Sequence, residues 1–132
     1  MTGRRSSLGL FGVFGRSGDL RALDQALRSF GLHPALVPDA VKLTVLNVLK
    51  DAGGKETSEQ DYRETAALVS YCALGREAFE AENGVLAVST AEHRIEAALE
   101  RGEGFDASMI LLALHARIIH PGVKESFQLE SE

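Results

Sequence analysis

Four side chains in the sequence are of types that carry out catalysis: Cys72, His93, Glu96 and His115. A cysteine acts as a nucleophile when a neighbouring group lowers the pKa of its thiol, and a histidine can do this. His93 and Glu96 are three positions apart, so on a helix they share a face and could form an acid–base pair or bind a metal ion. These residues support one hypothesis, a small enzyme or ligand-binding protein with a pocket between helices.

A structural role also accounts for each of these residues. A single cysteine in an apolar helix behaves as a small hydrophobic side chain. Glu92, Glu96 and Glu100 recur at steps of four, which is typical of a solvated helix face. His115 and His120 are five positions apart, so they lie on different faces of a helix. We therefore predict no cofactor and no metal site, and we favour a protein that is not an enzyme.

The N-terminal residues differ in composition from the rest of the chain. Glycines recur every three positions between apolar residues, at Gly9, Gly12, Gly15 and Gly18. Frequent glycine raises the entropic cost of ordering a backbone, so we predict a flexible arm over residues 1–18. Phe11 and Phe14 in this arm are candidate contacts for a protein partner. An alternative is peripheral attachment to a membrane through residues 4–16, where arginines would meet anionic headgroups.

Composition and charge narrow the classes of function. The chain has 132 residues, of which 45% are hydrophobic and 25% are charged, an ordinary mixture for one globular domain. The 19 acidic and 14 basic residues give a formal charge of −5, which disfavours nucleic acid as a partner. A single cysteine forms no internal disulfide, so the cytoplasm is the expected location. The longest nearly unbroken apolar run, residues 109–116, contains His115 and is too short to cross a bilayer.

Glycine and proline divide the first half of the domain into two predicted helices. The first begins at Asp19, a good N-cap residue, and stops at Gly31. The second runs from about Pro38 to Ala52. A strand is the competing prediction there, because apolar and polar residues alternate over 41–45. The length of the segment favours a helix.

The second half of the domain is predicted to contain three further helices. The third covers residues 57–83, opens with a capping box formed by Thr57 and Gln60 or by Ser58 and Asp61, and carries Gly75 as a bend or a break. Residues 85–88 are predicted to be extended or short. The fourth helix begins at a second capping box and ends at a glycine, over Ser89–Gly102.

The last predicted helix is capped by Asp106 and covers residues 107–119. His120, Pro121 and Gly122 then form a stop signal, because proline does not continue a helix. The acidic tail that follows, residues 123–132, is predicted to be frayed.

The sequence therefore predicts an all-α fold, a compact bundle of about five helices over residues 19–122, orthogonal or up-and-down, with the second and last helices at its centre. No catalytic motif stands out, whereas the arm and the acidic faces offer surfaces. We favour a non-catalytic accessory or protein-interaction domain, with a protein partner or a homodimer as its expected association.

Overall fold

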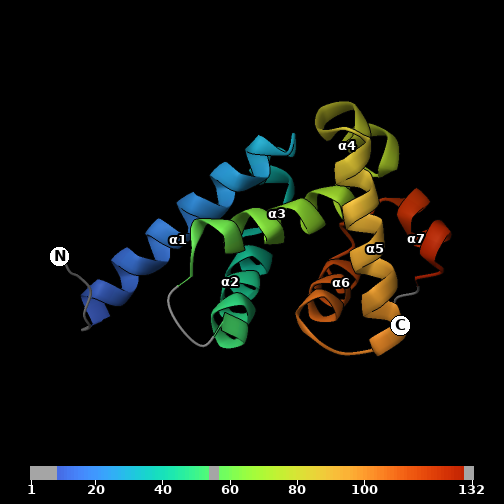
Figure 1. The fold of residues 1–132 in the computed structure, drawn as a ribbon. Coiled ribbons are helices and arrows are strands. Elements are labelled where there is room, and N and C mark those ends of the chain that lie inside the picture. Colours follow the sequence, from blue (N-terminus) through green and yellow to red (C-terminus); the bar gives the residue numbers. More distant parts are fainter. Residues whose placement is uncertain (1–8, 54–56, 130–132) are drawn as a thin grey trace.

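The computed structural model describes the backbone of residues 9–53 and 57–129, and the side chains of 18–51 and 57–129. Within these residues the regular elements are all helical, which confirms the predicted all-α class (Figure 1). There are seven α-helices there, not five, and a short 3-10 helix. Their bounds are α1 Gly9–Ser29, η1 Pro34–Leu36, α2 Asp39–Gly53, α3 Glu59–Leu74, α4 Arg76–Asn83, α5 Val85–Arg101, α6 Phe105–His115 and α7 Pro121–Phe127.

The first helix begins ten residues earlier than predicted, at Gly9 and not at Asp19. The prediction was wrong because it considered the entropic cost of the glycines and not the ease of extending a helix that has already formed. Extending an existing helix by one residue is far easier than nucleating a new one, so a stable turn can recruit residues of low propensity before it. Part of the predicted arm 1–18 is therefore helical backbone, and residues 1–8 lie outside the described residues.

The predicted end of the first helix and the position of the second are confirmed. Gly31 has a φ of +92°, and the N–H of Leu32 donates to the carbonyl of Leu27 at 3.1 Å, which closes the last turn of α1. The competing strand prediction for residues 41–45 is wrong, since they lie inside α2. Pro38 precedes α2, and its carbonyl accepts the first helical bond, from Lys42.

Gly75 splits the predicted third helix into α3 and α4. Its backbone has φ +90° and ψ +164°, a conformation that residues other than glycine rarely adopt. At the start of α3 the Ser58–Asp61 capping box is formed, as one of the two predicted pairings required. The break at Gly75 lets the chain change direction between two helices without a loop.

The extended segment predicted at 85–88 is absent, because α5 already begins at Val85. Gly84, with φ +93°, ends α4 and serves as the N-cap position of α5, so one residue separates the two helices. Ser89 is consequently inside a helix and does not cap one. No side-chain hydrogen bond caps α5, and its buried residues begin at Val88, after the exposed Val85 and Leu86.

The C-terminal part differs most from the prediction. Gly104, not Asp106, occupies the N-cap position of α6, and α6 ends at His115, four residues before the predicted end. Half of the predicted frayed tail, residues 123–127, belongs to α7, in which Val123 is 2% exposed, and residues 130–132 lie outside the described residues. His120 and Pro121 start α7 and do not stop α6, which has already ended at His115. Proline fits the first position of a helix.

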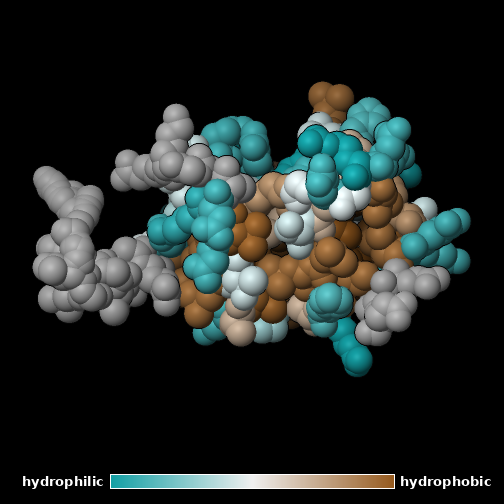
Figure 2. Space-filling model, turned by 90° about the horizontal axis from the view of Figure 1, so that it is seen from below, coloured by the Kyte–Doolittle hydropathy of each residue, from teal (hydrophilic) through white to brown (hydrophobic). Residues whose placement is uncertain are grey.

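The centre of the bundle is α3, and not the second and last helices of the prediction. Eight residues of α3 are buried, and it packs against α1, α4, α5 and α6. In Figure 1, α3 crosses the middle of the molecule, between α1 and α2 on one side and α5 and α6 on the other. α6 remains accessible: its Leu111 is 55% exposed. Seen from below, hydrophobic residues gather over the middle of the surface (Figure 2).

Arg94 joins three helices around this centre. Its guanidinium makes two hydrogen bonds to the carboxylate of Asp106 on α6, at 2.8 and 3.0 Å, and a third to the carbonyl of Glu64 on α3, at 2.7 Å. This fork geometry suits arginine and fixes the orientation of α5 relative to both neighbours. Asp106 lies inside α6, after Phe105, and not at its N-cap position.

Candidate functional site

Cys72 is buried in α3, with 1% of its surface exposed. Burial raises the pKa of its thiol to about 12, and the positive charge of Arg94 opposes this shift without cancelling it. The thiol is therefore protonated at neutral pH, whereas a nucleophilic cysteine needs the thiolate. This position is consistent with the structural role that the apolar surroundings indicated.

The thiol of Cys72 is expected to resist alkylation in the folded protein. Because its pKa is about 12, its thiolate fraction stays small as the pH rises from 7 to 9, a range in which an exposed cysteine becomes reactive. We expect iodoacetamide at pH 8.5 to label the folded chain at least about 100-fold more slowly than the chain in 6 M guanidinium, since labelling requires opening of the core. Mass spectrometry of the intact protein measures this. Labelling at similar rates in both conditions would show that Cys72 is accessible.

The other three candidates are exposed side chains on two helices. His93 and Glu96 lie on the outer side of α5, and His115 is the last residue of α6. Neither these three nor Cys72 lines any of the three cavities described below. Among the described residues there is also no group of three or more His, Cys, Asp or Glu that could hold a metal ion.

Glu92 differs from the other members of the acidic ridge on α5. Glu96 and Glu100 are exposed, whereas Glu92 is half-buried and its carboxylate accepts a hydrogen bond from the hydroxyl of Tyr71 at 2.8 Å. Arg76 lies 3.7 Å from the same oxygen. Burial and this hydrogen bond raise the pKa of the Tyr71 hydroxyl above its ordinary value, so the hydroxyl remains a donor.

The remaining predicted contacts fall on the N-terminal arm. Phe11 and Phe14 have helical backbone in α1, but their side chains lie outside the described part of the chain. The same holds for the side chains of residues 4–16, the predicted membrane-contact segment. No helix in the described residues is long and apolar enough to cross a membrane.

Three of the cavities on the described surface lie between helices. One, of about 330 Å³, lies between the junction of α3 and α4 and the start of α7, and Gly75, Arg76 and His120 are among its lining residues. A second, about 430 Å³, lies where α2, α3, α5 and α6 meet, and Arg94 and Asp106 already bond to each other there. The largest of these three, about 730 Å³, lies between the end of α6 and α7. We call this last cavity the α6–α7 groove.

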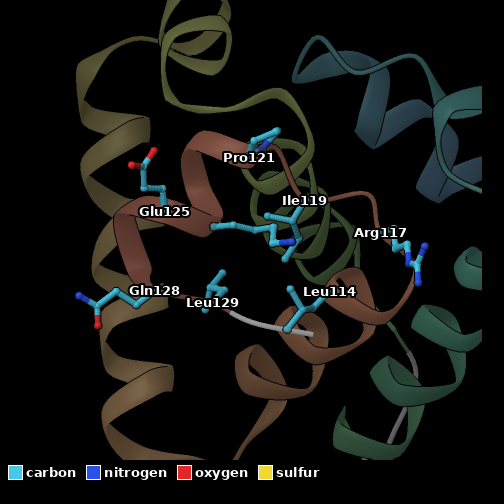
Figure 3. A pocket seen from close by; sticks show the side chains of 8 residues that line it. Leu114, Arg117, Ile119, Pro121, Glu125, Gln128 and Leu129 are labelled. Atoms are coloured by element: carbon cyan, nitrogen blue, oxygen red, sulfur yellow. The ribbon is translucent and has the colours of Figure 1, made fainter. Parts of the chain in front are cut away.

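The α6–α7 groove has an apolar floor and a charged rim. Its floor contains Leu114, Ile119 and Leu129, which are each less than one-tenth exposed. Its rim carries Arg117, Lys124, Glu125 and Gln128. In Figure 3, Arg117 lies on the opposite side of the groove from Glu125 and Gln128, and the leucines of the floor lie between them. The rim has two positive charges and one negative charge, on a chain whose formal charge is −5.

Two rim residues have an unusual backbone. Arg117 has a φ of +62° and Gln128 a φ of +55°, and these are the two residues other than glycine with positive φ in the described part of the chain. Each follows a helix. The N–H of Ile118 donates to the carbonyl of Ala113, and that of Leu129 to the carbonyl of Lys124, in the helix-ending pattern that usually places glycine at the left-handed position.

The end of α1 shows what this pattern looks like with glycine. The N–H of Leu32 donates to the carbonyl of Leu27 at 3.1 Å in the same way, and the N–H of Gly31 donates to the carbonyl of Arg28 at 3.0 Å. A side chain at such a position costs about 1 kcal/mol relative to glycine. Arg117 and Gln128 bear this cost, and both line the same groove. Backbone strain of this kind concentrates at functional sites, where the side chain is needed.

No protein-family model, no curated protein and no solved structure matches this chain. The class of protein is therefore defined by the fold and the groove alone: an all-helical domain with an open, apolar and partly cationic groove beside its C-terminal helix.

Sequence reasoning did not find the residues of this groove. It treated His120 and Pro121 as an end, so α7 and the side chains that α7 places on the rim, Lys124 and Glu125, went unnoticed. A signal was present in the sequence. Val123 and Phe127 are four positions apart, as the inward residues of a helix are, and Leu129 follows soon after.

Proposed function

We propose that this protein is a non-catalytic interaction domain that binds a short acidic and apolar segment of a partner protein in the α6–α7 groove. The observation that carries the proposal is the placement of Arg117 and Gln128: at two helix ends that favour glycine, the chain keeps long polar side chains, and both line this groove.

The shape and charge of the groove support a peptide as the occupant. Four of its eight lining residues are exposed, so it is an open surface along which an extended segment can lie. The apolar floor offers burial to leucine-like side chains, which supplies most of the affinity in such contacts. Arg117 and Lys124 complement carboxylates in the segment, and this complementarity selects acidic over basic partners.

A selection experiment tests this function without a known partner. A random dodecapeptide library displayed on phage is panned against the full chain. We expect enriched peptides to combine aspartate or glutamate with leucine, isoleucine or phenylalanine. Their synthetic versions are then measured by fluorescence anisotropy against the wild type and Arg117→Gly. We expect Kd to rise about tenfold in the variant, the factor for a contact of about 1.4 kcal/mol.

The variant also has a stability signature that separates a binding role from a structural one. Arg117→Gly relieves the left-handed strain, so we expect its free energy of unfolding to be unchanged or up to about 1 kcal/mol higher while binding is lost. Arg101→Ala is the matched control, because it removes one positive charge from an exposed helix end outside the groove. The proposal fails if the selected peptides bind Arg117→Gly and the wild type equally, or if no acidic preference emerges.

A further inference from the structure

Two histidines in this chain cap helices in the same unusual way. His33 precedes Pro34 at the start of η1, and His120 precedes Pro121 at the start of α7. In each case the ring Nδ1 accepts a hydrogen bond from the backbone N–H two residues later, from Ala35 at 3.1 Å and from Gly122 at 2.9 Å. Proline has no N–H, so this is the first donor that each helix offers.

This geometry requires a neutral imidazole ring. In a neutral ring one nitrogen accepts and the other donates, whereas in the protonated ring both nitrogens carry hydrogen and neither accepts. Protonation therefore removes the capping bond. It also places a positive charge at a helix N-terminus, where the helix dipole repels cations. Histidine changes its charge in the range between about pH 5 and 8.

His120 attaches the start of α7 to the centre of the bundle. Its backbone N–H donates to the carbonyl of Cys72 on α3 at 2.7 Å. Its ring packs so closely on Gly75 that a Cβ at that position would lie 2.8 Å from the ring Cγ. Six of the eight residues that line the α6–α7 groove lie between Ile119 and Leu129. The groove therefore depends on the position of this segment.

We propose that His120 is a pH-dependent latch for α7: neutral His120 holds α7 in place and forms the α6–α7 groove, and protonated His120 releases the start of α7 and loosens the groove. Only the part of this inference that concerns binding rests on the proposed function. The order of α7 itself can be measured without any ligand.

Charged groups of opposite sign lie around the His120 ring, so the capping bond is the main difference between the neutral and the protonated ring. From α4, Arg76 opposes a positive ring and Glu77 favours one, since both line the cavity that the ring lines. On α7, Lys124 lines the α6–α7 groove and not this cavity. From α3, Tyr71 remains neutral, with its hydroxyl bonded to Glu92 of α5. Stability from the cap is therefore present at high pH and is lost as the pH falls.

Amide hydrogen exchange of the full-length chain tests the latch. Exchange is followed by NMR at pH 7.5 and pH 5.5 and corrected for the intrinsic pH dependence of exchange. We expect the protection of Val123 and Lys124, whose N–H groups bond to the carbonyl of His120, to fall about fivefold at pH 5.5, the size of the loss of one N-cap bond. Asparagine caps helices without titrating, so His120→Asn should abolish this pH dependence. His33→Asn, the matched control at η1, should retain it in α7.

The outcomes separate the latch from the function of the groove. Equal protection of α7 at both pH values in the wild type overturns the latch, and so does a pH dependence that persists in His120→Asn. A fivefold weaker affinity of a selected acidic peptide at pH 5.5 that disappears in His120→Asn supports both ideas. If α7 loses protection at pH 5.5 but no acidic peptide binds the protein at either pH, the result supports the latch and counts against the proposed function.

Discussion

Replacing Gly75 by alanine is expected to lower the free energy of unfolding by about 2–4 kcal/mol. With φ +90° and ψ +164°, Gly75 has a backbone conformation that is essentially restricted to glycine, and a side chain there costs about 1–3 kcal/mol. The new Cβ would also lie 2.8 Å from the ring of His120. The ring must then move, and the capping bond to Gly122, worth about 1 kcal/mol, is lost. Urea denaturation followed by circular dichroism measures the change.

Gly84→Ala is a matched control for this substitution. Gly84 has nearly the same backbone, with φ +93° and ψ +170°, but no atom lies within 4 Å of a Cβ built there. It should show the backbone cost alone, so Gly75→Ala should be more destabilising by about 1 kcal/mol. Combining Gly75→Ala with His120→Ala should cost less than the sum of the two single changes, because they disrupt the same contact. Equal effects of Gly75→Ala and Gly84→Ala would show that the contact with His120 contributes nothing to stability.

The glycines also show which parts of the fold could be predicted from the sequence. Gly31 and Gly102 end helices as predicted, because a glycine after an apolar repeat is a local signal. The sequence indicated that Gly75 and Gly84 interrupt helices, but it did not indicate that a single residue separates the two helices at each place. A single glycine can turn the chain directly from one helix into the next, and only packing of the second helix decides whether it does.

Packing over long distances explains the parts that sequence reasoning missed. His120 and Pro121 are compatible with a helix end and with a helix start, and the burial of Val123 and Leu129 favours the start. The groove exists only because α7 returns to the end of α6, which depends on helix crossing angles that no local pattern contains. The same holds for Cys72, whose neighbours in space determine the pKa of its thiol.

Phe79→Ala is expected to be the most destabilising single change, by about 3–5 kcal/mol. Phe79 on α4 is fully buried, with 0% of its surface exposed. Its ring is stacked with that of Phe30, with centroids 6.2 Å apart, and meets the ring of Tyr71 edge-on at 5.5 Å. Removing it empties the point at which the end of α1, α3 and α4 meet, and it removes aromatic contacts that add to the loss of apolar burial.

Phe105→Ala is the matched control, since it deletes the same atoms from a half-buried ring at the start of α6. We expect it to cost less than half as much, because part of the Phe105 ring is already in contact with water. Denaturation midpoints in urea, compared at unchanged m-values, give both numbers. Equal losses from the two substitutions would mean that the aromatic cluster of Phe30, Tyr71 and Phe79 is no more important than the rim of the bundle. A larger loss at Phe79 would show that this cluster contributes more to the stability of the fold than the half-buried ring of Phe105 does.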